Sequence, residues 1–204
     1  MIEAPGDMLE GGGQVLRMSV AISAAAKKPI RVVNIRAKRK PPGLRPQHLT
    51  AIKSVASLSG AKVEGLSVGS MSIEFTPSTP RGGDFRFDVG TAGSTTLILQ
   101  ALIPAALYAQ KPTTIEIRGG TNNPWAPPID YLNLVMLPTL SCMGVNASVS
   151  LLRRGFYPRG GGVIRARINP VKSLKPIKLV EGGGVKRVFG LSYSCRLPDH
   201  IARR

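Results

Sequence analysis

The stretch GGGQVLRMSVAISAAAKKP at residues 11–29 is matched, later in the chain, by GSTTLILQALIPAALYAQKP at residues 93–112. Each begins in a glycine-containing turn, continues as an apolar run of helical character and ends in Lys-Pro. A segment that alternates in the manner of a strand follows each one, PIRVVNIR at 29–36 and PTTIEIR at 112–118. The sequence therefore predicts a duplicated unit.

The remainder of each unit repeats as well. A proline-rich loop leads to a second helix that ends in glycine, at 46–60 and again at 127–144. Two strands then follow, within 61–77 and within 145–170. The order predicted for the unit is thus helix, strand, helix, strand, strand. We expect an α/β fold in which the helices of each unit pack on a four-stranded sheet.

This reading sets the domain boundaries. The first unit is expected at residues 1–80 and the second at 81–172, while residues 173–204 begin a third unit or an insert domain. Strands are expected within 176–195, and the chain breaks off soon after them. We interpret this abrupt ending as that of part of a longer protein.

The charge is strongly positive, with 28 Lys and Arg against 11 Asp and Glu and a net charge of +17. Such an imbalance favours a polyanionic partner, and a solvated basic surface is the alternative. The chain has no apolar run of 18 residues and its N-terminus is acidic and glycine-rich, so we expect neither a membrane span nor a signal peptide. Cys142 and Cys195 are expected as buried thiols in a reducing cytoplasm, not as a disulfide.

The strongest candidate for an anion site is the loop RAKRKPPGLRPQHL at 36–49. Its prolines and glycine stiffen a segment that carries five cations, and a helix begins near Gln47. Guanidinium groups form bidentate contacts with phosphate oxygens, so a bound anion would relieve the mutual repulsion of these cations. The alternative is an ordinary solvated loop.

The glycine run at 11–13 matches neither a Walker motif nor a dinucleotide fingerprint. The glycine run becomes a stronger candidate for a phosphate site when it is paired with the equivalent turn GTAGSTT at 90–96, because two helix N-termini then face one cleft. Arg17 would project from the first helix, and Gln100 from the second. Glu10 could hold a divalent ion that bridges phosphates, or it could be a solvent-exposed carboxylate.

Two loops could contact nucleic acid. Trp125, in the loop GGTNNPWAPPIDYL at 119–132, could stack on a base or pack against the loop prolines. The segment RRGFYPRGGGVIR at 153–165 interleaves arginines with aromatic residues, which suits single-stranded nucleic acid but also suits a hairpin bend. The two histidines form no catalytic triad or metal cluster, and the cations near His48 should keep it neutral.

Five blocks in order resemble the RNA 3′-terminal phosphate cyclase family, over nearly the whole chain: EGGGQVLR, IRAKRKPPGLRPQHL, RGGDFRFDVGTAGSTTLILQ, GGTNNPWAPPIDYL and RRGFYPRGGG. The resemblance implies repeated units like those of EPSP synthase and a small insert domain beginning near residue 180. It also implies conversion of an RNA 3′-phosphate to a 2′,3′-cyclic phosphodiester. ATP would first adenylylate a histidine, and the adenylate would then pass to the RNA.

By position, the resemblance implies a role for each of several side chains. Glu10 would be the ligand of Mg²⁺ or Mn²⁺ near the ATP phosphates. The side chains that grip the triphosphate or the terminal RNA phosphate would be Arg17, Arg36, Arg39 and Gln47. The nucleotide would contact Gln14, Gln100 and Pro127.

There are two departures from the family pattern. The adenylylated histidine of the family lies beyond residue 204, and neither His48 nor His200 matches its motif, so this chain alone should bind anions without forming the covalent intermediate. The residues before the glycine run, GDML, are also altered. The alternatives are a non-catalytic cyclase-like protein of ribosomal RNA processing and an RNA-binding fragment. The sequence is also compatible with a homodimer.

Overall fold

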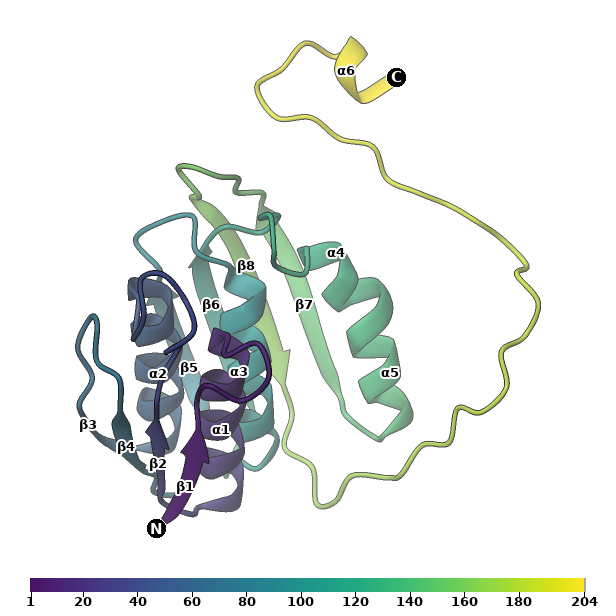
Figure 1. Ribbon diagram of the computed structural model, residues 1–204. Coiled ribbons are helices and arrows are strands. Elements are labelled where there is room, and N and C mark those ends of the chain that lie inside the picture. The colour runs from purple at the N-terminus through teal and green to yellow at the C-terminus, as the bar shows by residue number, and fades with distance from the viewer. Residues whose placement is uncertain (204) are drawn as a thin grey trace.

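The structure is a computed structural model that describes residues 1–203, so Arg204, the last residue of the expected third unit, lies outside the described residues. Two units follow one another in the chain (Figure 1). The elements of the first unit are β1 (Ile2–Pro5), α1 (Gly13–Ala26), β2 (Ile30–Val33), α2 (Pro46–Ser59), β3 (Lys62–Glu64) and β4 (Ile73–Thr76). Those of the second are β5 (Gly83–Asp88), α3 (Thr95–Leu107), β6 (Thr113–Gly119), α4 (Ile129–Tyr131), a π-helical turn (Leu132–Met136), α5 (Leu137–Cys142), β7 (Ala147–Arg153) and β8 (Gly162–Ile168).

The two sheets have the same topology, which confirms the duplication. Their strand orders are β1-β2-β4-β3 and β5-β6-β8-β7, so corresponding strands take corresponding places. In each sheet the first pair is parallel and the other pairs are antiparallel. The α/β fold with helices on four-stranded sheets is therefore as predicted.

The predicted order within the unit was incomplete, because each unit opens with a strand. β1 and β5 are edge strands that pair in parallel with β2 and β6. A parallel edge strand finds its partner only after a whole intervening helix, so neither strand is marked by a hairpin turn to a neighbour, although β5 alternates aromatic and charged residues. β1 even ends in Pro5, which an edge strand tolerates because one side of its backbone makes no ladder hydrogen bonds.

The helices of the two units share one core. α3 is buried around most of its circumference and packs against both α1 and α2 as well as β6. A helix that is apolar on all sides belongs inside a protein, and α3 fills that place between the units. Leu99 and Leu102 have no exposed surface, so replacing either with alanine should cost about 2–5 kcal/mol of stability.

The helix predicted over 127–144 is present but interrupted. It begins as α4, passes through the π-helical turn and continues as α5. A π-helical turn inserts one extra residue into the helix and is frequent at functional sites. Here only the short helix α4 separates it from the loop that carries Trp125.

The last part of the described chain differs from the prediction. Residues 172–199 form neither helix nor strand, and the short helix α6 (His200–Arg203) ends the described part (Figure 1). A strand requires a neighbouring strand to pair its backbone groups, and among residues 1–203 no strand of either sheet pairs with this segment, which contacts the second unit at Lys175 and Tyr193. That it begins a third unit stays a prediction. No helix among residues 1–203 is long and apolar enough to cross a membrane.

The two cysteines are free and exposed. The expectation of unpaired thiols is met, but the expectation that they are buried was wrong. Cys142 ends α5, a helix without a buried residue, and Cys195 lies in the segment outside the core.

Candidate anion-binding site

Three helices begin at the same end of the molecule (Figure 1). α1, α2 and α3 pack against one another, and none has an acidic residue in its first turn. Each helix N-terminus presents free N–H groups and about half a positive charge. The three together make a region that favours an anion.

The first turns of α1 and α2 meet at Gly13. A Cβ atom on Gly13 would overlap Nε2 of His48 and lie 3.0 Å from Nη1 of Arg17. Only glycine leaves room for both side chains here, which is a physical reason for the third glycine of the run at 11–13. The run thus allows helix α1 to approach α2 and places the Arg17 guanidinium at the joint between them.

His48 has a structural task at this joint. Its side chain is 3% exposed, and Nδ1 accepts a hydrogen bond from the backbone N–H of Arg45 at 3.1 Å. Burial, together with the charges of Arg36, Arg17 and Arg45, lowers the pKa of His48 to about 4. The imidazole is therefore neutral near pH 7, as predicted from the surrounding cations.

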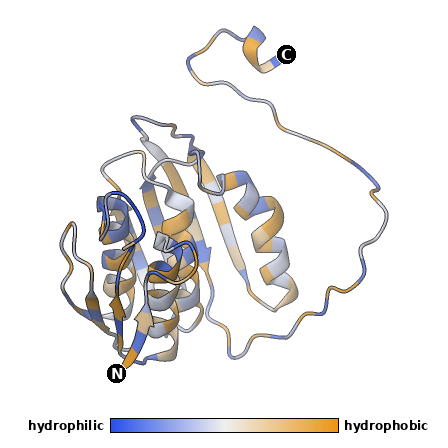
Figure 2. Cartoon of the chain, viewed as in Figure 1, coloured by the Kyte–Doolittle hydropathy of each residue, from blue (hydrophilic) through white to orange (hydrophobic). Residues whose placement is uncertain are grey.

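The basic loop at 36–45 joins β2 to α2 and is one of the hydrophilic parts of the molecule in Figure 2. Arg36 braces the loop, because its Nη1 donates to the carbonyl oxygens of Pro41 at 3.0 Å and Gly43 at 2.9 Å. Burial and the neighbouring charges of Arg45 and Arg39 lower the pKa of Arg36. Cations that repel one another in this way are held ready for an anion.

Arg39 connects the basic loop to the glycine run. Its Nη2 donates to Oε2 of Glu10 at 3.3 Å, and both side chains are well exposed. A solvated pair of this kind contributes about 0–1 kcal/mol to stability. Both groups are therefore free to exchange this contact for a ligand.

Glu10 is the one carboxylate proposed from the sequence as a metal ligand. The described residues contain no cluster of three or more His, Cys, Asp or Glu side chains that could form a protein-only metal cage. Mg²⁺ commonly uses one or two carboxylates together with substrate phosphates and water. Glu10, exposed beside a region that favours phosphates, fits that mode of binding.

The residues predicted to contact a nucleotide converge. Gln14 and Arg17 from α1, Gln100 from α3, and Pro127 from the loop before α4 line a single pocket of about 540 Å³, called here the α1–α3 pocket. This volume lies within the range of small-molecule sites, about 300–1,000 Å³. Burial lowers the pKa of Arg17, which still retains its proton because the guanidinium is so basic. Residues far apart in the two units thus meet in one cationic pocket.

The remaining predicted residues lie around this pocket. Gln47 lines a neighbouring pocket, Glu10 lies in a third hollow beside the glycine run, and Arg36 and Arg39 belong to the basic loop. His48 links these parts, because it follows Gln47 on α2 and contacts the joint at Gly13. The structure therefore resolves the predicted site into a nucleotide-sized pocket with a basic rim.

Several lining residues of the α1–α3 pocket were not proposed from the sequence, among them Met18 and Tyr131. Met18 lines it because it lies four positions after Gln14 and so shares a helical face with it, a signal that the sequence contains. Tyr131 lines it from α4, and only the course of the preceding loop determines that position.

A second contact set fixes that loop. Arg154 donates two hydrogen bonds of 2.9 Å to the carboxylate of Asp130 and a third of 3.1 Å to Asn122. The Arg154 guanidinium holds the pKa of Asp130 below its usual value. The charged residues are visible in the sequence, but nothing in it shows that Asp130 pairs with Arg154, 24 positions later.

The fold and site define a duplicated α/β protein with a cationic, nucleotide-sized pocket where its helices begin. The sequence model of the family described as "RNA 3′-terminal phosphate cyclase" matches residues 8–196, and the chain belongs to this family. It is 49% identical over 205 residues to a Staphylothermus marinus protein named RNA 3′-terminal phosphate cyclase, and 51% identical over 204 residues to one from Ignicoccus hospitalis. The alignments cover 100% of this chain and 57% and 58% of those relatives.

Among solved structures, an EPSP synthase from Acinetobacter baumannii matches with a TM-score of 0.38 and 12% identity, over 81% of this chain and 48% of that one. This similarity is too low to support a conclusion. The repeated fold rests instead on the two matching sheets.

Proposed function

We propose that the complete protein converts an RNA 3′-phosphate to a 2′,3′-cyclic phosphodiester at the expense of ATP. The observation that carries the proposal is the convergence of Gln14, Arg17, Gln100 and Pro127 from both units on one pocket. The family and the named relatives supply the chemical identity of the reaction.

The proposed reaction has three displacements at phosphorus. A histidine, expected outside residues 1–204, attacks the α-phosphate of ATP, and diphosphate leaves. An oxygen of the RNA 3′-phosphate then attacks the adenylate, and the histidine leaves. Finally the neighbouring 2′-hydroxyl attacks the 3′-phosphorus, loses its proton and displaces AMP, which closes the cyclic diester.

Each displacement requires charge neutralisation and alignment, and this chain offers the groups for both. We assign Gln14, Gln100 and Pro127 to the nucleotide and Arg17 to its phosphates. We assign Arg36, Arg39 and Gln47 to the terminal RNA phosphate and the triphosphate. His48 is not proposed as the nucleophile because its Nδ1 caps α2 and its ring is buried.

Glu10 is the residue we assign to Mg²⁺ or Mn²⁺. When bound, such an ion would neutralise phosphate charge and polarise the phosphorus. Glu10 can turn from Arg39 to the ion without breaking a buried contact, because the pair is exposed. Arg39 is thereby released toward a phosphate.

The wider setting follows from the same proposal. RNA with a 3′-terminal phosphate suits the net charge of +17, and the proposed compartment is the cytoplasm. Residues 1–80 and 81–172 are proposed as separate repeat units, with a third unit or insert beginning at 173. A homodimer is the assembly to be tested by measuring molecular mass in solution.

The test is the intact mass of the complete protein after incubation with ATP and Mg²⁺. We expect the gain of one adenylate that is labile to acid and resistant to hydroxylamine, as a phosphoramidate is. A verified complete chain that takes up no adenylate would refute the proposal. If that chain still binds RNA, it is a non-catalytic relative of the cyclases.

A further inference from the structure

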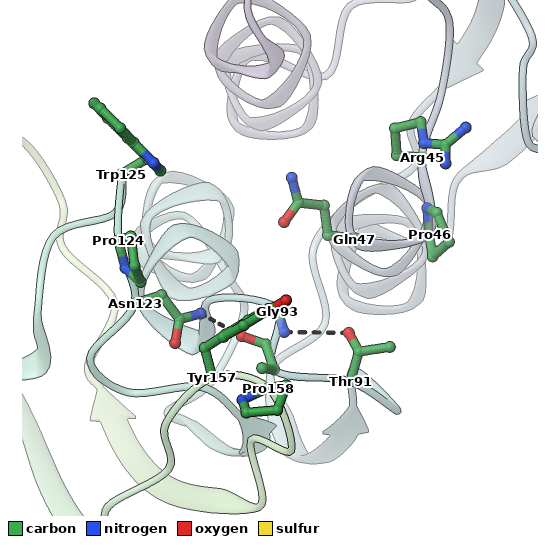
Figure 3. A pocket seen from close by; sticks show the side chains of 11 residues that line it. Arg45, Pro46, Gln47, Thr91, Gly93, Asn123, Pro124, Trp125, Tyr157 and Pro158 are labelled. Carbon is green, nitrogen blue, oxygen red and sulfur yellow. Dashed lines mark hydrogen bonds between the residues drawn. The ribbon is translucent and has the colours of Figure 1, made fainter. Parts of the chain in front are cut away.

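A second pocket of about 570 Å³ lies beside the α1–α3 pocket (Figure 3). We call it the aromatic pocket. It is bounded by the start of α2 with Arg45 and Gln47, by the loop with Asn123 and Trp125, and by Tyr157 and Pro158 from the β7–β8 connection. Segments from both units therefore form the aromatic pocket, as they form the α1–α3 pocket.

Two aromatic rings border this pocket and are left open to solvent. The side chain of Trp125 is fully exposed, at 102%, and that of Tyr157 is 75% exposed. Trp125 also has a positive φ of 63°, a conformation that bulky residues rarely adopt. An indole held out in this way by its backbone is typical of a surface that stacks on a ligand.

The loop that presents Trp125 is anchored and not free. Asn123 Nδ2 donates a hydrogen bond to the carbonyl oxygen of Ala92, and Thr91 Oγ1 accepts one from the backbone N–H of Gly93 at 3.1 Å (Figure 3). The Asn123 bond ties the loop before α4 to the turn before α3, and the Thr91 bond closes that turn itself. The aromatic pocket is therefore largely formed before any ligand arrives.

Polar groups that suit an anionic ligand face the same space. Gln47 points from α2 toward the loop of Trp125 (Figure 3). Its backbone N–H belongs to the first turn of α2, where an α-helix leaves N–H groups without an intrahelical acceptor. Arg45, the N-cap residue, also lines the pocket and adds positive charge. Flat apolar rings beside amides and a cation match a nucleoside phosphate.

Trp125 borders both pockets. A nucleotide in the α1–α3 pocket and a ligand in the aromatic pocket would therefore both lie next to the Trp125 indole. The basic loop that ends at Arg45 leads directly into α2, and so into the wall of the aromatic pocket. A terminal phosphate held by that loop would place the nucleoside to which it is attached in the aromatic pocket.

We propose that the aromatic pocket binds the nucleoside at the 3′ end of the RNA and that its base stacks on Tyr157 and Trp125. This inference rests on the proposed function, whose RNA substrate it locates. Stacking accepts any of the four bases because each has a flat π-face, so the pocket gives affinity for an RNA end without selecting a sequence.

The test compares Tyr157→Ala with the unmodified complete protein in equilibrium binding of a short 3′-phosphorylated RNA, without ATP so that no reaction occurs. We expect binding to weaken about 5- to 100-fold, the loss of one stacked base. Tyr157 lines the aromatic pocket and not the α1–α3 pocket, so its loss should leave the affinity for ATP unchanged, whereas Trp125→Ala should weaken the binding of both ligands. Tyr108→Ala is the matched control, because Tyr108 is an exposed aromatic residue at the opposite end of α3.

An RNA whose terminal nucleotide lacks its base separates stacking from a structural effect. The unmodified protein should bind this RNA at least as weakly as Tyr157→Ala binds the normal one, because the missing base also loses its contact with Trp125, and Tyr157→Ala should weaken binding of this RNA no further. Equal binding of the two RNAs, or an equal loss for both in Tyr157→Ala, would overturn the proposal. Adenylate uptake is measured separately, so a protein that takes up adenylate but shows no base dependence refutes this pocket assignment alone.

Discussion

The backbone N–H of Arg45 donates a hydrogen bond to Nδ1 of His48, 3.1 Å away. The ring can accept this bond only while Nδ1 carries no proton, because a protonated imidazole has a donor at each nitrogen. The same ring fills the space that Gly13 leaves open at the start of α1. The protonation state of one buried histidine is therefore coupled to the joint between two helices that frame the site.

Stability should fall as the pH drops from about 6.5 to 4. The pKa of His48 is lowered in the folded protein from 6.5 to about 4, so between these values the unfolded chain binds the additional proton. The stabilising contribution of the neutral ring is complete above pH 6.5 and lost below pH 4. This contribution to the free energy of unfolding is at most about 3 kcal/mol. Urea unfolding of the complete protein at several pH values measures it.

His48→Gln is the control for this pH dependence. It cannot titrate, so its unfolding free energy should change less between pH 6.5 and 4 than that of the unmodified protein. Asp130, Glu64 and Glu116, whose pKa values are lowered by partner side chains, titrate in both proteins, so their contribution cancels in the comparison. Parallel pH curves for the two proteins would show that His48 is not the group responsible.

Gly13→Ala should damage the site far more than Gly12→Ala. The new methyl group at 13 would clash with His48 and crowd Arg17, whereas the nearest atom to one at 12 is Arg39 Nη2 at 3.8 Å. We expect a loss of about 1–3 kcal/mol of stability from overpacking at 13 and weaker ATP binding. The change at 12 should cost less than about 1 kcal/mol. Similar effects of the two substitutions on unfolding and on ATP titration would contradict the packing described here.

Arg17→Lys should weaken ATP binding although it keeps the charge. Arginine offers a planar fork of donors to phosphate oxygens, and lysine does not. We expect about a tenfold or greater loss, comparable to one charge-assisted hydrogen bond. Arg31→Lys is the control, since Arg31 lies exposed on the first sheet beside Glu74. Calorimetric titration that gave Arg17→Lys an unchanged affinity would remove this residue from the phosphate site.

Arg39→Ala should abolish cyclisation and leave folding intact. Arg39 is exposed and its ion pair with Glu10 is solvated, so the unfolding free energy should change by less than about 0.5 kcal/mol. Its loss from the phosphate site should lower turnover by about 100-fold or more. A rate assay with a 3′-phosphorylated RNA checks this, and near-normal turnover would place Arg39 outside the site.

The sequence predicted the repeat because its signals are local. The Lys-Pro that follows each apolar helix and the glycine after α2 mark element boundaries within one stretch of chain. β1 and β5 were not predicted, although β5 alternates aromatic and charged residues, because the strand that pairs with each of them follows a whole helix later. The π-helical turn at Leu132–Met136 has no local signature.

The sequence predicted single site residues and a cleft between the starts of two helices, but not how the loops around that cleft are arranged. The basic loop and the first turn of α1 were visible as charge beside glycine. The meeting of Trp125, Tyr157 and Gln47 in one pocket depends on how two loops and the start of α2, all distant in the sequence, fold together. Likewise, Glu10 could be named as a carboxylate, whereas its contact with Arg39 spans 29 positions.

The most direct test of the central claim follows the RNA itself. The complete protein is incubated with ATP, Mg²⁺ and an RNA with a labelled 3′-terminal phosphate, and the product is treated with phosphatase. The account predicts that the phosphate becomes resistant to phosphatase as a 2′,3′-cyclic diester and that AMP forms in equal amount. A phosphate that stays fully removable, with the complete protein folded and ATP present, would contradict it.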